Sequence, residues 1–169
     1  LAWNPDRTEQ AEQAWADLAS HLGFSGRRPE KESGVGPDVL WADSDGNHLV
    51  IEVKSGAEAA LISKRDINQL GGSVRWAEQQ LNRTSSIAAV VVHPGRIAER
   101  TGTPPFGARS IDTDAHTKLM AAVRQYATAL AVENRYRDAA AVQQQLVSLH
   151  FNGRQLVEFY GAVVQLEGS

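Results

Sequence analysis

Two carboxylates and one lysine are the residues of this chain whose types and spacing could carry out chemistry. Asp38 opens the mainly apolar stretch 38–42, and Glu52 and Lys54 close the stretch 48–54. The five residues between these stretches, Asp-Ser-Asp-Gly-Asn, are turn formers, and the pattern predicts a β-hairpin. With a loop of that length, Asp38 lies directly opposite Glu52 on the paired strand.

The hairpin is predicted to bring the three side chains to one edge of a sheet. Because side chains alternate along a strand, Glu52 and Lys54 point to the same face. Opposed carboxylates repel and raise each other's pKa, so the pair Asp38 and Glu52 favours a bound cation. Oxygen ligands suit Mg²⁺ or Mn²⁺, and the backbone carbonyl of Val53 could complete the ligand set. Such a site can hydrolyse phosphodiesters, with the metal acidifying a water molecule and Lys54 stabilising the developing charge.

Two helices and a short loop segment are predicted around the hairpin. Asn4 followed by Pro5 is typical of a helix start, and apolar residues at helical spacing continue to about residue 21. The stretch 25–36 combines Gly, Pro and mixed charge and is interpreted as a loop that could hold a short strand. After the hairpin, Ser63 begins a capping box that predicts a helix over about 64–81.

The second half of the chain is predicted to add one buried strand and several helices. The run 87–92 consists of β-branched residues and alanine, which indicates a strand buried on both faces, and 94–110 is expected to be an irregular loop. Helices are predicted over about 114–134 and 137–151, and helical spacing continues from Leu156 to the end. This order predicts an α/β fold with a mixed central sheet of four or five strands, the first helix on one face and the later helices on the other.

The hairpin motif resembles that of a known enzyme superfamily. Gly36-Pro37-Asp38, thirteen further residues and then Glu52-Val53-Lys54 are similar to the signature of the PD-(D/E)XK nucleases. The resemblance extends over about residues 9–92, because the helix before the hairpin and the helix and strand after it follow the same order. It implies a restriction endonuclease-like, three-layer α/β/α fold, here with extra C-terminal helices.

The resemblance also implies roles for two helix residues. In that superfamily a glutamate on the leading helix often completes the metal site, and Glu12 is the best match, with Glu9 as the second choice. Gln69 resembles the glutamine that many members place near the metal. Ser73 stands where RecB-like exonucleases carry a tyrosine, and the chain has no cysteines for their iron-sulfur cluster. These departures favour restriction-type or Mrr-like endonucleases.

The implied function is Mg²⁺- or Mn²⁺-dependent cleavage of nucleic acid. Asp38, Glu52 and Glu12, with the Val53 carbonyl, would hold the metal, Lys54 would be the catalytic lysine, and Gln69 would assist. DNA is the expected substrate, and a restriction or phage-defence protein is the expected setting. One alternative is a repair or recombination nuclease, and another is an inactive nucleic-acid-binding or assembly module with the same fold.

The net charge of −3 argues against nucleic-acid binding by bulk charge, so phosphate contacts are expected from local basic clusters. Such contacts would position a duplex without reading its sequence. Three clusters lie near the predicted elements: Lys64, Arg65 and Arg75; Arg27, Arg28 and Lys31; and Arg96, Arg100 and Arg109.

Length and composition bound the remaining possibilities. A chain of 169 residues is about the length of one domain, and a start at Leu1 with Met120 as its only methionine leads us to expect a part of a larger polypeptide. The absence of cysteine excludes disulfides and thiolate zinc sites and agrees with a cytoplasmic location. No apolar run approaches the roughly 18 residues of a membrane span. A homodimer would let one site per chain cut both strands of a duplex.

Overall fold

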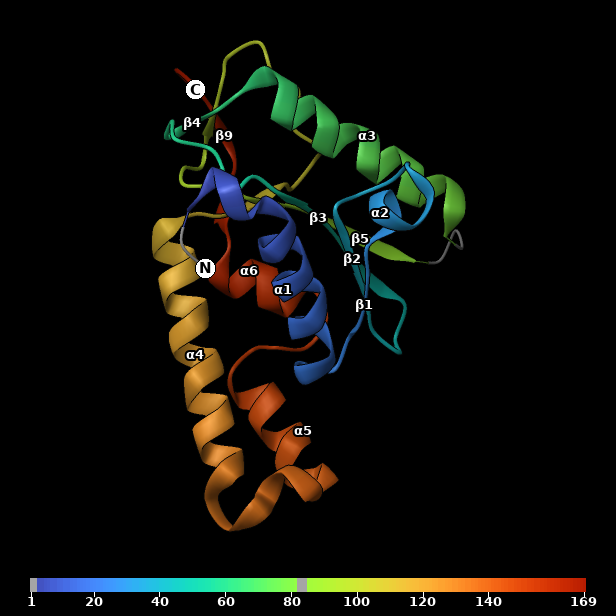
Figure 1. Ribbon diagram of the computed structural model, residues 1–169, viewed down its shortest axis with the longest axis vertical. Helices are drawn as coiled ribbons and strands as arrows, with labels where there is room; N and C mark the ends of the chain where they lie inside the picture. The colour runs from blue at the N-terminus through green and yellow to red at the C-terminus, as the bar shows by residue number, and fades with distance from the viewer. Residues whose placement is uncertain (1–2, 82–84) are drawn as a thin grey trace.

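A mixed sheet of six strands forms the centre of the computed structural model, which describes residues 3–81 and 85–169 (Figure 1). The strands, in spatial order, are β1 (Ser25–Arg27), β2 (Val39–Ala42), β3 (Asn47–Val53), β5 (Ser86–Val92), β7 (Arg109–Ile111) and β8 (Ala162–Val163). The pairs β3–β5 and β5–β7 are parallel, and the other three pairs are antiparallel. The predicted α/β class with a mixed sheet is confirmed, although the sheet has six strands instead of four or five.

The predicted hairpin is formed by β2 and β3, and its register is the expected one. Val39 pairs with Ile51, so Asp38, one residue before β2, lies opposite Glu52. The turn is held by the carboxylate of Asp43, whose Oδ1 accepts the backbone N–H of Asn47 at 2.8 Å while its Oδ2 accepts the side-chain amide of the same residue at 2.7 Å. The turn therefore fixes the register that brings the predicted site residues together.

The two helices beside the hairpin also begin and end close to the predicted residues. Helix α1 (Thr8–His21) follows a 3-10 turn, η1 (Pro5–Arg7), in which the backbone N–H of Asp6 donates to Asn4 Oδ1 at 2.9 Å. Helix α3 (Lys64–Gln80) starts at Ser63, whose hydroxyl accepts the backbone N–H of Asp66 at 3.1 Å. Both caps confirm the predicted helix starts.

The helices are divided between the faces of the sheet in a way that was not predicted. Helices α1, α4 (Thr113–Ala131), α5 (Ala139–Ser148) and α6 (Gln155–Tyr160) bury their apolar residues against one face, and α3 covers the other. The prediction that the first and later helices lie on opposite faces is therefore wrong for α4, α5 and α6. Buried residues of α1, α4, α5 and α6 belong to one continuous apolar core, so these helices share one face of the sheet.

Short elements complete the fold between these layers. A second sheet of three parallel two-residue strands consists of β4 (Leu61–Ile62), β6 (Ile97–Ala98) and β9 (Gln165–Leu166). The loop before the hairpin contains the short helix α2 (Pro29–Ser33) as well as β1, and the predicted loop 94–110 contains β6 and the beginning of β7. These elements are too short to show a period in the sequence.

The chain does not end in a helix, as the helical spacing after Leu156 predicted. Helix α6 stops at Tyr160, and Val163 and Leu166 lie in β8 and β9. Gly161 has an extended backbone, and a Cβ atom there would come within 2.6 Å of the Val157 carbonyl oxygen.

Between α4 and α5, a 3-10 segment, η2 (Val132–Arg137), interrupts the predicted helices. None of the helices in the described residues is long and apolar enough to cross a membrane.

Candidate active site

The three residues that the hairpin was predicted to bring together do meet at the end of β3. The Lys54 ammonium nitrogen lies 2.9 Å from Glu52 Oε2 and 3.3 Å from Asp38 Oδ2. Asp38 Oδ2 also accepts the backbone N–H of Val53 at 2.7 Å. This bond ties the carboxylate of the residue before β2 to the last residue of β3, so the site is built into the hairpin itself.

Glu52 is the most deeply buried member of the group, with no exposed surface. Its second oxygen, Oε1, accepts the hydroxyl of Ser73 at 2.6 Å. Burial raises the pKa of Glu52 to about 7; the Lys54 ammonium opposes this rise, and the negative charge of Asp38 adds to it. Burial by itself would lower the pKa of Lys54, but the carboxylates of Glu52 and Asp38 outweigh it, so the pKa lies above its ordinary value. Lys54 therefore stays charged at neutral pH.

An open cavity of about 510 Å³ gives solvent access to this group. Asp38, Val53 and Lys54 line it from the hairpin, Glu12 from α1, and Gln69 from α3. The residues that complete the lining are Thr8, Gly56, Ala57, Arg65 and Asp66. Every predicted site residue except the buried Glu52 thus lines one cavity. Glu52 lies behind this lining and accepts a hydrogen bond from Lys54, which does line the cavity.

Glu12 faces the cavity but is also held from behind by a buried arginine. Arg28 is 7% exposed and donates hydrogen bonds to Glu12 Oε2 and, at 3.2 Å, to the side-chain oxygen of Gln13. Burial and the charge of Asp38 raise the pKa of Glu12 despite this ion pair. Glu9, the second choice for the same role, is exposed and pairs with Lys31 at 2.5 Å.

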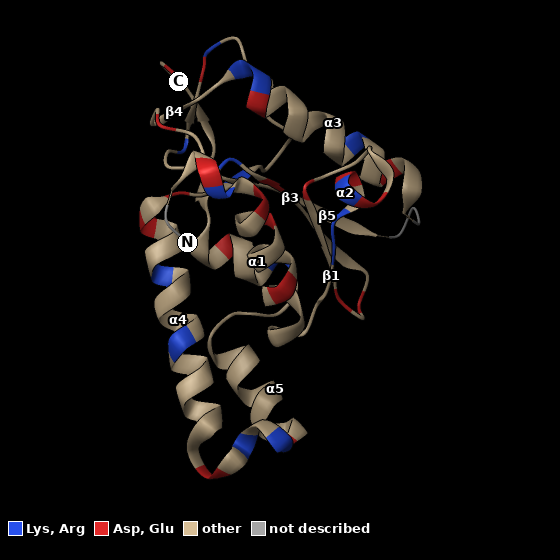
Figure 2. Cartoon of the chain, in the orientation of Figure 1, with Lys and Arg blue, Asp and Glu red and all other residues tan. Residues whose placement is uncertain are grey.

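Ion pairs also involve the basic cluster before the hairpin, which was expected to contact phosphate. Arg28 is buried, Lys31 pairs with Glu9, and Arg27 pairs with Glu32 at 2.5 Å, so the cluster before the hairpin is engaged within the protein. Basic residues also lie at the start of α3 and further along that helix (Figure 2). Of these, Arg65 lines the cavity beside Lys54.

A further carboxylate, that of Glu30, lies at the site and was not predicted. Its backbone N–H donates to the carbonyl oxygen of Pro37 at 3.2 Å, which places the first turn of α2 beside Asp38. A hydrogen bond with the side chain of Asp38, together with burial, raises the pKa of Glu30. The bond to Pro37 forms only when the loop before the hairpin is folded. In the sequence, α2 is marked only by Pro29, a residue typical of a helix start.

The donor atoms at the site fit a divalent cation in chemistry and in charge. When Glu12, Glu30, Asp38 and Glu52 are ionised, they carry four negative charges, and the basic side chains paired with members of this group are Lys54 and Arg28. One divalent ion would balance the difference, and carboxylate oxygens are the ligands that Mg²⁺ and Mn²⁺ prefer. As the side chains stand, with Lys54 between Asp38 and Glu52, no three His, Asp or Glu groups in the described residues are arranged to hold a metal ion. The contribution of the Val53 carbonyl stays a prediction.

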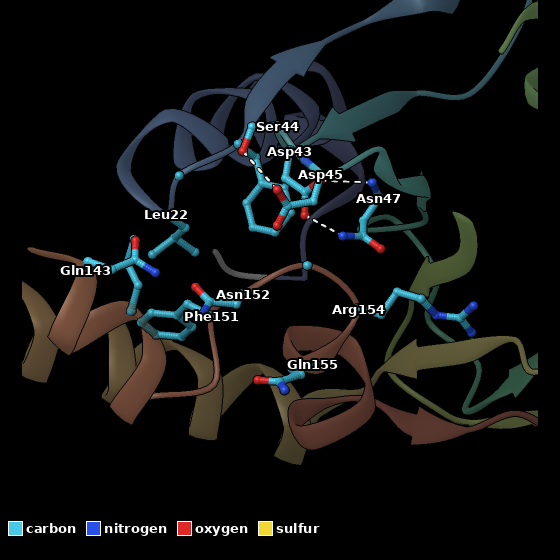
Figure 3. A pocket seen from close by; sticks show the side chains of 14 residues that line it. Leu22, Asp43, Ser44, Asp45, Asn47, Gln143, Phe151, Asn152, Arg154 and Gln155 are labelled. Carbon is cyan, nitrogen blue, oxygen red and sulfur yellow. Dashed lines mark hydrogen bonds between the residues drawn. The ribbon is translucent and has the colours of Figure 1, made fainter. Parts of the chain in front are cut away.

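A second cavity, of about 420 Å³, lies at the other end of the hairpin (Figure 3). The β2–β3 turn forms one wall, where Asp43 and Asn47 are joined by hydrogen bonds, and the residues between α5 and α6 form the opposite wall, with Phe151 and Asn152. The carboxylate of Asp43 is occupied by the turn, and no lysine or histidine lines this cavity. The cavity beside Lys54, by contrast, is lined by a lysine together with the carboxylates of Glu12 and Asp38.

No protein-family model, curated protein or solved structure matches the chain. The function is therefore inferred from the geometry and chemistry of the site.

Proposed function

We propose that this protein is a metal-dependent nuclease of the PD-(D/E)XK type that hydrolyses phosphodiester bonds in DNA. The observation that carries the proposal is the contact of one lysine ammonium with two carboxylates, Asp38 and Glu52, at the edge of an open cavity. A restriction endonuclease-like fold is part of the proposal. It is supported by the succession of α1, the antiparallel strands β1 to β3, α3, and β5 parallel to β3.

The residues of the site divide the work of hydrolysis between them. Asp38 and Glu52, with the Val53 carbonyl and Glu12, would hold Mg²⁺ or Mn²⁺, which when bound acidifies water and polarises the scissile phosphate. Lys54 stabilises the negative charge that develops on the phosphate, an effect of the order of 10² to 10³ in rate for one well-placed donor. Gln69 and Arg65 face the same cavity and would orient the phosphate.

A restriction or phage-defence role fits the proposed chemistry, and a repair or recombination nuclease would use the same residues. The alternative that is not an enzyme is an inactive nucleic-acid-binding or assembly module with the same fold. The intact set of Asp38, Glu52 and Lys54 favours catalysis, because an inert module has no need of a buried glutamate held by a lysine.

Incubation with DNA separates an active nuclease from an inactive module. The purified protein is mixed with supercoiled plasmid, linear duplex and single-stranded DNA, with Mg²⁺, with Mn²⁺ and with a chelator. We expect nicking or linearisation of the plasmid with either metal, and none with the chelator.

The matched control is Lys54→Met, which removes the ammonium group and keeps a long side chain. Cleavage should fall at least about 100-fold, because the charge on the reacting phosphate loses its stabilising cation. Folding is checked by circular dichroism. Equal cutting by the variant and the parent, or cutting that survives the chelator, would contradict the proposal.

A further inference from the structure

Ser73 occupies a position of α3 where an apolar side chain would be expected. The buried face of the helix consists of Ile67, Leu70, Ser73 and Ala77, and Ser73 is only 5% exposed. A hydroxyl group that is buried without a hydrogen bond destabilises a fold, because it loses its bonds to water. The presence of serine here is therefore explained by the group that its hydroxyl contacts.

That group is the carboxylate of Glu52. The Ser73 hydroxyl donates to Glu52 Oε1 at 2.6 Å, while Lys54 donates to the other oxygen, Oε2, at 2.9 Å. Because a different donor engages each oxygen, turning the carboxylate plane about its terminal bond would disturb both hydrogen bonds. Since Glu52 is fully buried, neither bond could be replaced by one to bulk water without moving the strand.

We propose that Ser73 is a positioning residue for metal binding by Glu52. By holding Oε1, Ser73 directs Oε2 towards Lys54 and Asp38, on the side of the cavity, so the carboxylate is oriented before an ion arrives. Hydrogen bonds of this kind, made to a ligand and not to the metal, typically change metal affinity by 10- to 100-fold when they are removed. The inference rests on the proposed function, because it concerns the same site.

The test is the affinity for Mn²⁺, measured by titration calorimetry on the full chain. Ser73→Ala removes the hydroxyl, and Ser73→Cys keeps the size of the side chain with a much weaker donor. We expect both variants to bind Mn²⁺ about tenfold more weakly than the parent. Ser73→Thr keeps the hydroxyl and should bind Mn²⁺ as the parent does. Urea denaturation establishes that each variant is folded. If the Ala variant does not fold, the affinity of the Cys variant for Mn²⁺ decides the test.

Ser55 supplies the matched control. It is a buried serine directly after Lys54, and its hydroxyl has no hydrogen-bond partner among the described residues. Ser55→Ala should leave the Mn²⁺ affinity unchanged.

Three results would overturn the role of Ser73 while leaving the nuclease proposal intact. These are unchanged affinity in the folded Ala or Cys variant, affinity in Ser73→Thr as weak as in Ser73→Ala, and equal weakening by Ser55→Ala. A parent protein that binds no Mn²⁺ would overturn both proposals.

Discussion

Glu52 keeps its proton at a pH where an exposed glutamate has lost it, because burial raises its pKa from 4.5 to about 7. Between these values the folded protein holds a proton that the unfolded chain has released, so stability falls as the pH rises. We expect the free energy of unfolding of the metal-free protein to decrease by about 1 to 3 kcal/mol over this interval. Urea denaturation at a series of pH values measures it.

The control for this prediction is Glu52→Gln, which has the same shape and no proton to release. The carboxyls of Glu12 and Glu30 also have raised pKa values, so the difference between the parent and variant curves isolates Glu52. The difference in unfolding free energy should change by the amount given above between pH 4.5 and pH 7. Parallel curves would show that Glu52 titrates normally.

The site residues that could be predicted from the sequence are those whose placement depends on one hairpin. Asp38, Glu52 and Lys54 follow from the strand period and the turn, and these contacts are local in the sheet. Glu30 and Ser73 escaped prediction because each reaches the site through a contact between different elements. Two signals could have directed attention to Ser73: it is a serine in the apolar stripe of α3, and it stands where the resembled exonucleases carry a tyrosine.

At the scale of elements, α3 presents two arginines to different surroundings. Arg65, in its first turn, lines the cavity beside Lys54, whereas Arg75 lines a separate hollow formed with the loop 103–106. A phosphate at the active site would therefore meet Arg65 and not Arg75. Arg65→Ala should reduce the slope of the logarithm of DNA affinity against the logarithm of salt concentration by about one, and Arg75→Ala should leave the slope unchanged.

This difference can be measured by fluorescence anisotropy with a labelled duplex and Mg²⁺. The Lys54→Met background keeps the DNA intact during the titration. Arg65→Ala and Arg75→Ala each remove one arginine from α3. A difference between their slopes therefore reflects the position of the arginine and not the loss of one positive charge. Equal slopes for the two variants would exclude Arg65 as a phosphate contact.

The elements that the sequence predicts are those with their own start signals and enough length to show a period. The hairpin has a turn cluster, and α1 and α3 have side-chain caps. The two-residue strands β8 and β9 have neither, and their apolar residues are spaced as in a helix. Their pairing partners lie in β7 and β6, more than fifty residues earlier, so local patterns cannot identify them.

The carboxylates of the site come from separate parts of the chain. Glu12 lies on α1, Glu30 on α2, Asp38 before β2 and Glu52 on β3. A bound cation would reduce the repulsion among them, and it would be released when the protein unfolds. Metal binding should therefore stabilise the complete fold and not only the site.

Mn²⁺ should raise the melting temperature of the protein, and a chelator should reverse the effect. A ligand at 100 times its dissociation constant stabilises the folded state by about 2.7 kcal/mol. For a chain of this length, that corresponds to an increase of roughly 5 to 10 °C. Asp38→Asn keeps an oxygen that can accept the Val53 N–H but removes the charge, so the variant should show little of this increase. Scanning calorimetry with Mn²⁺ and with chelator compares the two proteins, and an equal increase in both would remove Asp38 from the ligand set.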